Sequence, residues 1–407
     1  MRRKLLSVVL CVCMMMTMAP FAFAEGESIG AQESVVAKIG DQEYSTLQAA
    51  INAATTGQTI QLIADTTDAT SNSYIIQDGK ELNLDLNGKH LTLPEIISEY
   101  FIIKNGKLTI TDTSTEGNGE IIATKCDNLI DIQGSNTSFN FEKGTIVLNG
   151  YWSYKNIKYG NTAVLIRLDT ESTDATGTPS VNFGKDAKIV IANKSGDDTI
   201  YPGWAIMVNG IAREKAAHYG ATVDVYGQII NGGLYVNGTV VATQNTVPVF
   251  NVYDGAKIDG QIYAAGYAKW NISGGDIKAD TGMEIRAGEL NMTGGSLVGT
   301  ATPTSVKPNG NGGTSDGVGL AIAQHTTRLP ISVNISSGTI SGFTGLLECN
   351  PQNGSSADIE KINVSISGGN FTASNGGTNA AFSEDNRLTI TGGTFSSDVS
   401  AYVADGY

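Results

Sequence analysis

The residues in this sequence best suited to chemistry are a few carboxylates with one histidine and one arginine. Asp197 and Asp198 are adjacent, Asp316 lies in a Gly-rich segment, and His218 and Arg286 complete the set. Two carboxyl groups about 6.5–9.5 Å apart would suit inverting hydrolysis of a glycosidic bond. The sequence separations predict that these fragments do not meet on one face. We therefore interpret Asp197 and Asp198 as solvated loop carboxylates and His218 as a surface or loop histidine, and we predict no catalytic residue.

The histidines and acidic residues also lack the spacing of a metal site. His90 and His325 are isolated in the sequence. Neither the Gly-Gly-x-Gly-x-Asp repeat nor the EF-hand spacing of Asp and Asn occurs. The sequence therefore predicts no metal ion and no cofactor.

An aromatic segment, NGYWSYKNIKYGN at residues 149–161, is the best candidate for a binding surface. It lies in a long interval between sequence repeats, so we expect a loop that projects from the body. Aromatic rings offer flat apolar faces on which sugar rings stack. The YPGWA segment at 201–205 would lie beside it. The candidate glycan contacts are Tyr151, Trp152, Tyr154, Tyr159 and Trp204; the alternative is that these rings pack inward and hold the loop down.

The elements that must position these residues are short repeats with one shared pattern. Each has an apolar, a polar and an apolar residue, then a Gly-rich turn, then another apolar residue. Successive repeats start 20 to 43 residues apart, and the longer intervals indicate insertions. The repeats are FNFEKGTI at 139–146, VNFGKDAKI at 181–189, VDVYGQI at 223–229, FNVYDGAKI at 250–258, WNISGGDI at 270–277, LNMTGGSL at 290–297, VNISSGTI at 333–340, VSISGGNF at 364–371 and LTITGGTF at 388–395.

Self-similarity with a period in the twenties indicates a solenoid. Alternating apolar and polar residues predict short strands with one buried face, and the Gly residues supply the positive φ of a tight corner. Leucine-rich repeats need a regular Leu/Asn spacing that is absent here, and propeller blades need about twice the period. We predict an all-β protein, a right-handed parallel β-helix of roughly a dozen coils over residues 67–407, without a clear C-terminal cap.

Coils that stack in register make specific contacts predictable. Side chains at equal positions in neighbouring coils should form ladders. Cys126 and Cys349 lie many coils apart, whereas a disulfide needs Cα atoms within about 7 Å, so we expect free, buried thiols. The expected stacks are Ile272 on Met292, Ile277 on Leu297, Asn271 on Asn291, Tyr226 on Tyr253 and Tyr235 on Tyr263.

Residues 25–66 are predicted to form a linker, a strand and a capping helix. Ser45 and Gln48 make a capping-box pattern before a helix over residues 47–54. The apolar residues of this helix recur at i, i+3, i+4 and i+7, which gives it one apolar face. Such a helix would cover the open apolar end of the β-helix.

Residues 1–24 have the pattern of a secretory signal peptide: a basic start, an apolar run and the small-residue sequence AFA at 22–24. Cleavage after Ala24 would leave no membrane-spanning segment. It would also remove three positive charges and take the formal net charge from −14 to −17. An acidic surface repels phosphate backbones, which argues against a nucleic-acid partner. We expect a secreted or cell-surface protein.

Four stretches carry a resemblance to a known family. They are IGDQEYSTLQAAINAATTGQTIQLIAD at 39–65, ELNLDLNGKHLTL at 81–93, KLTITDTSTEGNGEI at 107–121 and ITGGTFSSDVSAYVADGY at 390–407. Together they resemble the secreted pectate-lyase-like, or pectin lyase fold, β-helix surface proteins of gut Gram-positive bacteria. The resemblance implies the β-helix fold and a surface location rather than a particular activity.

Two functions follow as expectations. The first is a non-catalytic secreted or cell-surface protein, an adhesin-like rod that binds polysaccharide, host glycans or host proteins. The second is a polysaccharide lyase or glycoside hydrolase that acts on pectin-like polysaccharide. Because the sequence shows no cluster of carboxylates, we favour the first.

Overall fold

The computed structural model describes residues 34–69, 72–154, 157–168, 177–192, 200–201, 203–209, 220–237, 247–302, 307–308, 313–314, 317–323, 329–349, 361–382 and 387–407. Val35–Tyr407 form one compact unit, separate from Met1–Ser34. The residues of the predicted signal peptide lie outside the described part of the chain. No helix among the described residues is long and apolar enough to cross a membrane.

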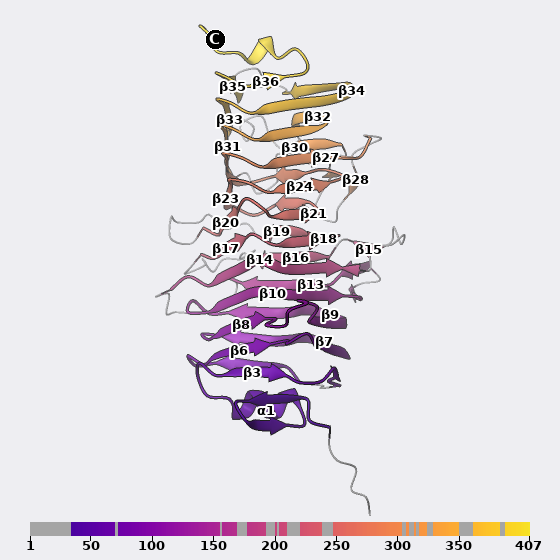
Figure 1. Ribbon diagram of the computed structural model, residues 1–407. Coiled ribbons are helices and arrows are strands. Elements are labelled where there is room, and N and C mark those ends of the chain that lie inside the picture. Colours follow the sequence, from indigo (N-terminus) through magenta and orange to yellow (C-terminus); the bar gives the residue numbers. More distant parts are fainter. Residues whose placement is uncertain are drawn as a thin grey trace, which may run out of the picture. The chain divides into compact units, whose positions relative to one another are not determined.

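The compact unit is a parallel β-helix (Figure 1). From β3 onward, each strand of its main sheet pairs in parallel with a strand of the coil before it or after it. These pairings form three columns of strands, which we call columns 1, 2 and 3. The chain passes through them in that order in each coil, and the longest strands bend from one column into the next.

Column 1 contains the repeat motifs and holds twelve described strands, in agreement with the predicted size. Its strands are β3 (Thr59–Leu62), β6 (Glu81–Asp85), β8 (Lys107–Thr111), the first part of β10 (Ser138–Leu148), the first part of β14 (Ser180–Ile191), β17 (Thr222–Val225), β20 (Val249–Val252), β23 (Ala268–Ile272), β26 (Gly288–Met292), β31 (Ile331–Ile335), β33 (Ile362–Ile366) and β35 (Leu388–Ile390).

Columns 2 and 3 complete each coil. Column 2 consists of β4 (Thr66–Thr67), the first parts of β7 (His90–Lys104) and β9 (Glu120–Gln133), the second parts of β10 and β14, β18 (Gln228–Ile230), β21 (Lys257–Asp259), β24 (Asp276–Ala279), β27 (Ser296–Gly299), the first parts of β32 (Thr339–Cys349) and β34 (Asn370–Ala381), and β36 (Thr394–Phe395). Column 3 consists of β5 (Tyr74–Gln77), the second parts of β7 and β9, β13 (Thr162–Arg167), β16 (Trp204–Asn209), β19 (Gly233–Asn237), β22 (Ile262–Ala264), β25 (Met283–Ile285), β30 (Val318–Ala323) and the second parts of β32 and β34.

The register predicted from the sequence repeats is confirmed. Ile272 pairs with Met292 and Ile277 with Leu297 in neighbouring coils. The Asn271 and Asn291 amides form a ladder, in which Asn291 Nδ2 donates to Asn271 Oδ1 at 3.4 Å. The ladder continues through Asn251, Asp224 and Asn334. Polar side chains on the outer side of column 1 therefore hydrogen-bond along the stack, while the alternate residues fill the core.

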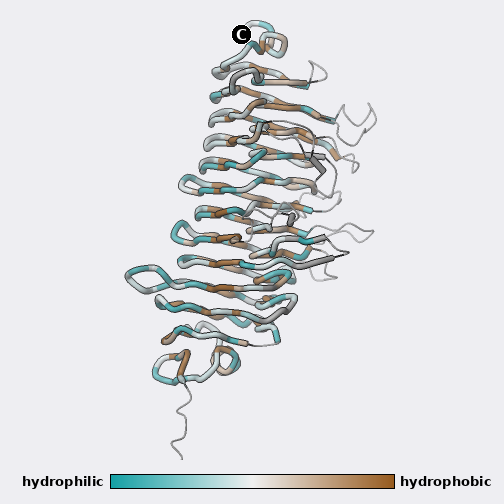
Figure 2. Tube along the Cα trace, turned by 90° about the vertical axis from the view of Figure 1, so that its right-hand side faces the viewer, coloured by the Kyte–Doolittle hydropathy of each residue, from teal (hydrophilic) through white to brown (hydrophobic). Residues whose placement is uncertain are grey.

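The core runs the length of the stack between the three columns. Along each coil, hydrophilic and hydrophobic segments alternate, as strands with one buried face require (Figure 2). Large aromatic side chains stack within the core: Phe250 lies 4.2 Å from Trp270, and Phe141 lies 5.9 Å from Phe183, measured between ring centroids. All four rings are buried. The interior is therefore a continuous apolar column rather than a channel.

The Gly-Gly pairs of the motif meet two separate steric demands at the corner between columns 1 and 2. Gly275 has φ +83°, a left-handed conformation that suits glycine. A Cβ on Gly274 would lie 2.5 Å from the Cα of Asp254 in the preceding coil. One glycine therefore makes the turn and the other permits the coils to stack closely.

The N-terminal end is covered by β1 (Ala37–Ile39), β2 (Gln42–Tyr44) and α1 (Leu47–Ala53). The helix buries Leu47, Ala50 and Ile51, as its apolar spacing predicted. The predicted capping box of Ser45 and Gln48 is wrong by one residue. Because the first helical residue is Leu47, the N-cap is Thr46, whose Oγ1 accepts a hydrogen bond from the Ala49 N–H at 3.1 Å.

At the other end of the stack, the 3₁₀ helix η3 (Ser400–Tyr402) follows the last strand. The Tyr402 ring packs edge-on against Phe382, with 5.8 Å between the centroids. Val403 then forms a parallel bridge with Ile390 of β35. This segment shields part of the core at the final coil.

The two cysteines behave in part as predicted. Neither Cys126 nor Cys349 is disulfide-bonded, and Cys126 is buried. The expectation that Cys349 is also buried is wrong: it is half-buried. Cys349 is the last residue of β32, and it pairs with Ala323, the last residue of β30, so both lie where the strands of column 3 end.

Candidate functional site

The aromatic segment forms a small sheet of its own, outside the main sheet. Strands β11 (Tyr151–Tyr154) and β12 (Ile157–Gly160) pair as an antiparallel hairpin, and β15 (Ile200–Tyr201) adds to β12 in parallel. The register places Trp152 opposite Tyr159, and Tyr159 opposite Tyr201. The backbone register therefore places three aromatic residues in one row across three strands.

Both ends of this hairpin contact β9 of the preceding coil. A Cβ on Gly150 would lie 1.8 Å from the Thr124 carbonyl oxygen, so only glycine allows this approach. At the other end, the buried Asn161 donates a hydrogen bond from Nδ2 to the Cys126 carbonyl oxygen. The hairpin thus leaves the coil between β10 and β13 at a defined corner, between columns 2 and 3.

Within the hairpin, Tyr151 is the candidate contact whose side chain the structure describes. The residue is 39% exposed, and Lys158 Nζ lies 5.0 Å from the ring centroid, a cation–π arrangement. The side chains of Trp152, Tyr154, Tyr159 and Tyr201 lie outside the described part of the structure, which gives only their backbone positions.

Trp204 lies three residues beyond β15, in the main sheet rather than in the hairpin. It is half-buried and stacks on Tyr235, with 4.7 Å between ring centroids, and Tyr235 stacks on Tyr263 at 5.2 Å. Cζ of the buried Arg286 lies 5.3 Å from the Tyr263 ring centroid and ends this stack. The predicted ladder of Tyr235 and Tyr263 is confirmed. So is the stack of Tyr226 on Tyr253, at 4.2 Å.

Beside the base of the hairpin, the fold assembles a charge cluster that no sequence motif indicated. Arg167 of β13 donates from Nε to Asp131 Oδ2 at 2.6 Å and from Nη2 to Glu99 Oε1 at 2.9 Å. Asp131 is fully buried, whereas 22% of the Glu99 side chain is exposed. Asp127 interacts electrostatically with both Glu99 and Arg167. Three carboxyl groups from two neighbouring coils therefore surround one guanidinium group.

Burial governs how these groups ionise. It raises the pKa of Glu99 above its ordinary value, as does the neighbouring charge of Asp131, while Arg167 acts in the opposite direction. Burial likewise raises the pKa of Asp127, again opposed by Arg167. The adjacent Cys126 thiol has its pKa raised to about 12, chiefly by burial, so it is protonated at neutral pH and is not a nucleophile.

The cluster could not be recognised in the sequence because its members are distant along the chain. Asp131 and Arg167 are 36 residues apart, and Glu99 and Arg167 are 68 apart. Of the residues that the sequence marks as best suited to chemistry, Asp197, Asp198, His218 and Asp316 lie outside the described residues. Arg286 is described: it is buried and ion-paired with Glu284, with Nη2 2.6 Å from Oε1.

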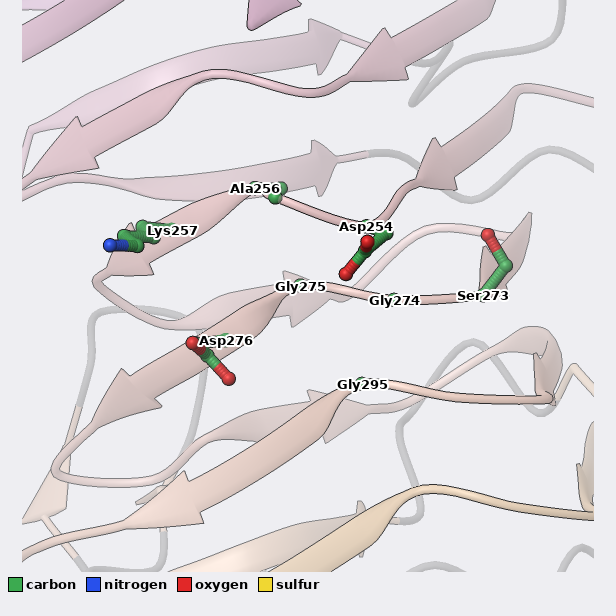
Figure 3. Close-up of a pocket in the computed structure, with 9 residues that line it drawn as sticks. Asp254, Ala256, Lys257, Ser273, Gly274, Gly275, Asp276 and Gly295 are labelled. Carbon is green, nitrogen blue, oxygen red and sulfur yellow. The ribbon is translucent and has the colours of Figure 1, made fainter.

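A second polar feature is a groove of about 270 Å³ at the Gly-rich corner between columns 1 and 2 (Figure 3). Asp254, Lys257, Ser273 and Asp276 line it together with bare glycine backbone. Ser296 Oγ already donates a hydrogen bond to Asp276 Oδ1 at 3.0 Å. The groove follows from the missing side chains of stacked glycines, and its volume is below the roughly 300 Å³ at which ligand sites begin.

Within the described ranges, no three His, Cys, Asp or Glu side chains are grouped so that they could hold a metal ion. This includes the cluster around Arg167, whose guanidinium occupies the position between the carboxylates. Comparison of the chain with protein-family models, with curated proteins and with solved structures finds no match.

Proposed function

We propose that this protein is a non-catalytic, secreted or cell-surface β-helix protein that binds glycans through the hairpin of β11, β12 and β15. The observation that carries the proposal is the row of Trp152, Tyr159 and Tyr201 on a sheet set apart from the main sheet. Aromatic residues outside the core provide flat faces for sugar rings and lose little conformational entropy on binding.

The charge of the chain narrows the class of glycan. Its formal net charge is −14, so the surface repels sulfated or otherwise strongly anionic polymers. Lys158 supplies a positive charge at the hairpin, but it lies against the Tyr151 ring. We therefore favour a neutral polysaccharide or a neutral host or cell-surface glycan as the partner, in an adhesin-like role.

Removal of the aromatic row is expected to abolish most of this binding. Trp152→Ala should weaken the affinity for a neutral glycan about tenfold or more, and adding Tyr159→Ala should weaken it further, because central aromatic contacts dominate such interfaces. A glycan array followed by titration calorimetry would measure the effect. Tyr407→Ala is the matched control, because Tyr407 is 77% exposed and lies outside the hairpin. Unchanged affinity in the double variant would contradict the proposal.

A second candidate function, hydrolysis of a polysaccharide, is favoured by the cluster of Glu99, Asp127 and Asp131 around Arg167 at the base of the same hairpin. Carboxyl groups with raised pKa values are suited to act as general acids. Against this role, Asp131 is fully buried, and both Asp131 and Glu99 are engaged in ion pairs with Arg167.

We expect incubation with the bound glycans to release no new reducing or unsaturated ends. The test is end-group analysis of every glycan that the array identifies, with Glu99→Gln run in parallel. Released products that fall about a hundredfold or more in Glu99→Gln would establish the hydrolase instead, since general acid–base catalysis contributes that much. Products that are equal in both proteins would indicate a contaminating enzyme.

A further inference from the structure

A polar cavity of about 340 Å³ lies where column 3 turns into column 1 in the N-terminal coils. It is on a different corner of the β-helix from the hairpin. Residues from four consecutive coils line it, and all of the described ones are polar or glycine. They are Gly79, Glu81, Asn105, Gly106, Lys107, Ser135, Asn136, Thr137, Ser138, Thr178 and Ser180.

The walls of this cavity are held by hydrogen bonds within the protein. Thr137 Oγ1 accepts from the Asn105 N–H at 2.9 Å and donates to the Gln133 carbonyl oxygen at 2.6 Å. Asn105 Oδ1 accepts from the Asn136 N–H at 3.4 Å. A Cβ on Gly106 would lie 2.9 Å from the Lys80 carbonyl oxygen, so the corner is closely packed behind the cavity. The cavity is therefore preformed.

The cavity is lined by one acidic and one basic side chain, those of Glu81 and Lys107. Glu81 and Lys107 are register neighbours in column 1. Across the described part of the chain, no ion pair or side-chain hydrogen bond engages the Glu81 carboxylate or the Lys107 ammonium group. Further along the same column, the register neighbours Lys269 and Glu289 do pair, with Nζ 3.7 Å from Oε2. Glu81 and Lys107 therefore do not pair at the cavity, although the same backbone register allows an ion pair between Lys269 and Glu289.

We propose that this cavity is a second carbohydrate site, which takes one neutral hexose unit and reads its pattern of hydroxyl groups. Register neighbours lie about 4.8 Å apart, so Glu81 and Lys107 can engage adjacent hydroxyl groups of one sugar, as acceptor and donor. Ser138, Ser180 and Thr178 add hydroxyl groups that both donate and accept. The two charges cancel, which matches a neutral sugar better than an acidic or basic one.

The site would complement the hairpin in its mode of recognition. None of the described residues that line the cavity is aromatic, so binding here relies on hydrogen bonds. A site built on hydrogen bonds to hydroxyl groups discriminates strongly against an isomer that leaves them unpaired. Aromatic stacking, in contrast, tolerates different sugars. The cavity proposal extends the proposed glycan binding to a second place, but it stands or fails separately from the hairpin.

The test is saturation-transfer NMR of the purified protein with glucose, galactose and mannose, each at millimolar concentration. We expect one hexose to bind in preference to its isomers, and Glu81→Gln or Lys107→Met to weaken its binding about tenfold. Ser180→Ala provides a third, smaller perturbation. Glu289→Gln is the matched control, because it removes the same charge from the same column at a position away from the cavity, and it should have no effect.

The hairpin variant Trp152→Ala separates the two sites. Hexose binding that persists in this variant and is lost in Glu81→Gln supports the cavity. Hexose binding that is lost in Trp152→Ala but persists in Glu81→Gln would place the sugar on the hairpin and overturn the proposal. The proposal is also overturned if no hexose gives a signal, or if all three cavity variants bind as the unchanged protein does.

Discussion

Replacing Trp270 with alanine is expected to lower the free energy of unfolding by about 3–5 kcal/mol, the usual cost of deleting a large aromatic side chain from a core. Trp270 is fully buried. Its ring stacks on Phe250 of the preceding coil, and Leu290 follows it in register in the next coil. Truncation would open a cavity in the middle of the stack, where the rigid neighbouring coils cannot collapse to fill it.

Urea denaturation followed by circular dichroism would measure this loss, and hydrogen exchange of β20, β23 and β26 would show where it acts. Trp270→Phe is the informative control. Within the described residues, Trp270 Nε1 has no hydrogen-bond partner, so phenylalanine removes volume without breaking a polar contact. We expect it to cost less than half as much as alanine. Equal losses in the two variants would mean that packing of the ring is not what holds these coils together.

Replacing Arg286 with methionine is the second large effect, with an expected loss of about 3–5 kcal/mol, because it leaves a buried charge without its partner. Both Arg286 and Glu284 are fully buried, with 2.6 Å between Nη2 and Oε1. Arg286 also lies over the Tyr263 ring, so the substitution removes a contact to the aromatic stack. Denaturation with urea at neutral pH would measure the loss.

Two comparisons isolate the ion pair in this experiment. Combining Arg286→Met with Glu284→Leu removes both charges and should restore most of the stability, since a buried pair is often replaceable by apolar groups. Lys269→Met breaks the exposed pair with Glu289, in which both side chains are 34% exposed, and should cost at most about 1 kcal/mol. If the double variant is as unstable as Arg286→Met alone, the unpaired charge is not the cause.

The loss of stability in Arg286→Met should also depend on pH. Burial raises the pKa of Glu284 above its ordinary value of 4.5, and Arg286 acts to lower it. A carboxyl group whose pKa is raised on folding favours the folded state below its ordinary pKa, and that contribution is lost as the pH rises through the folded pKa. Without Arg286 the folded pKa rises further. The deficit of Arg286→Met relative to the unchanged protein should therefore be smaller at pH 4 than at pH 8.

The sequence predicted the stacking of coils best where successive repeats are short. The motifs at Asn271 and Asn291 are separated by 20 residues, and the structure pairs them residue for residue. Alternation fixes this register, because a shift of one residue would turn Ile272 out of the core and Asn271 into it. The glycine turns were predictable for the same reason, since the corner needs a positive φ at a position such as Gly275.

Prediction was weaker where an insertion interrupts a coil. The 149–161 segment was expected to project, and the structure does place it outside the main sheet, but its pairing with Ile200–Tyr201 had no signal in the sequence. That pairing requires the insertions of two neighbouring coils to lie side by side, so that β12 and β15 can hydrogen-bond. The helix cap was also misplaced by one residue, because Ser45 and Thr46 are chemically equivalent caps and only the path of the chain selects Thr46.

By itself, then, the sequence determined the β-helix, its register over the regular coils and the ladders of Asn and Tyr side chains, because these follow from the period of the apolar residues. Only the tertiary structure decided which charged residues meet. Arg167 joins Glu99 and Asp131 across 68 and 36 residues, and Glu81 faces the same cavity as Thr178. In a solenoid, neighbours along the axis are set by the length of each coil. Once insertions make that length irregular, spacing in the sequence no longer indicates proximity in space.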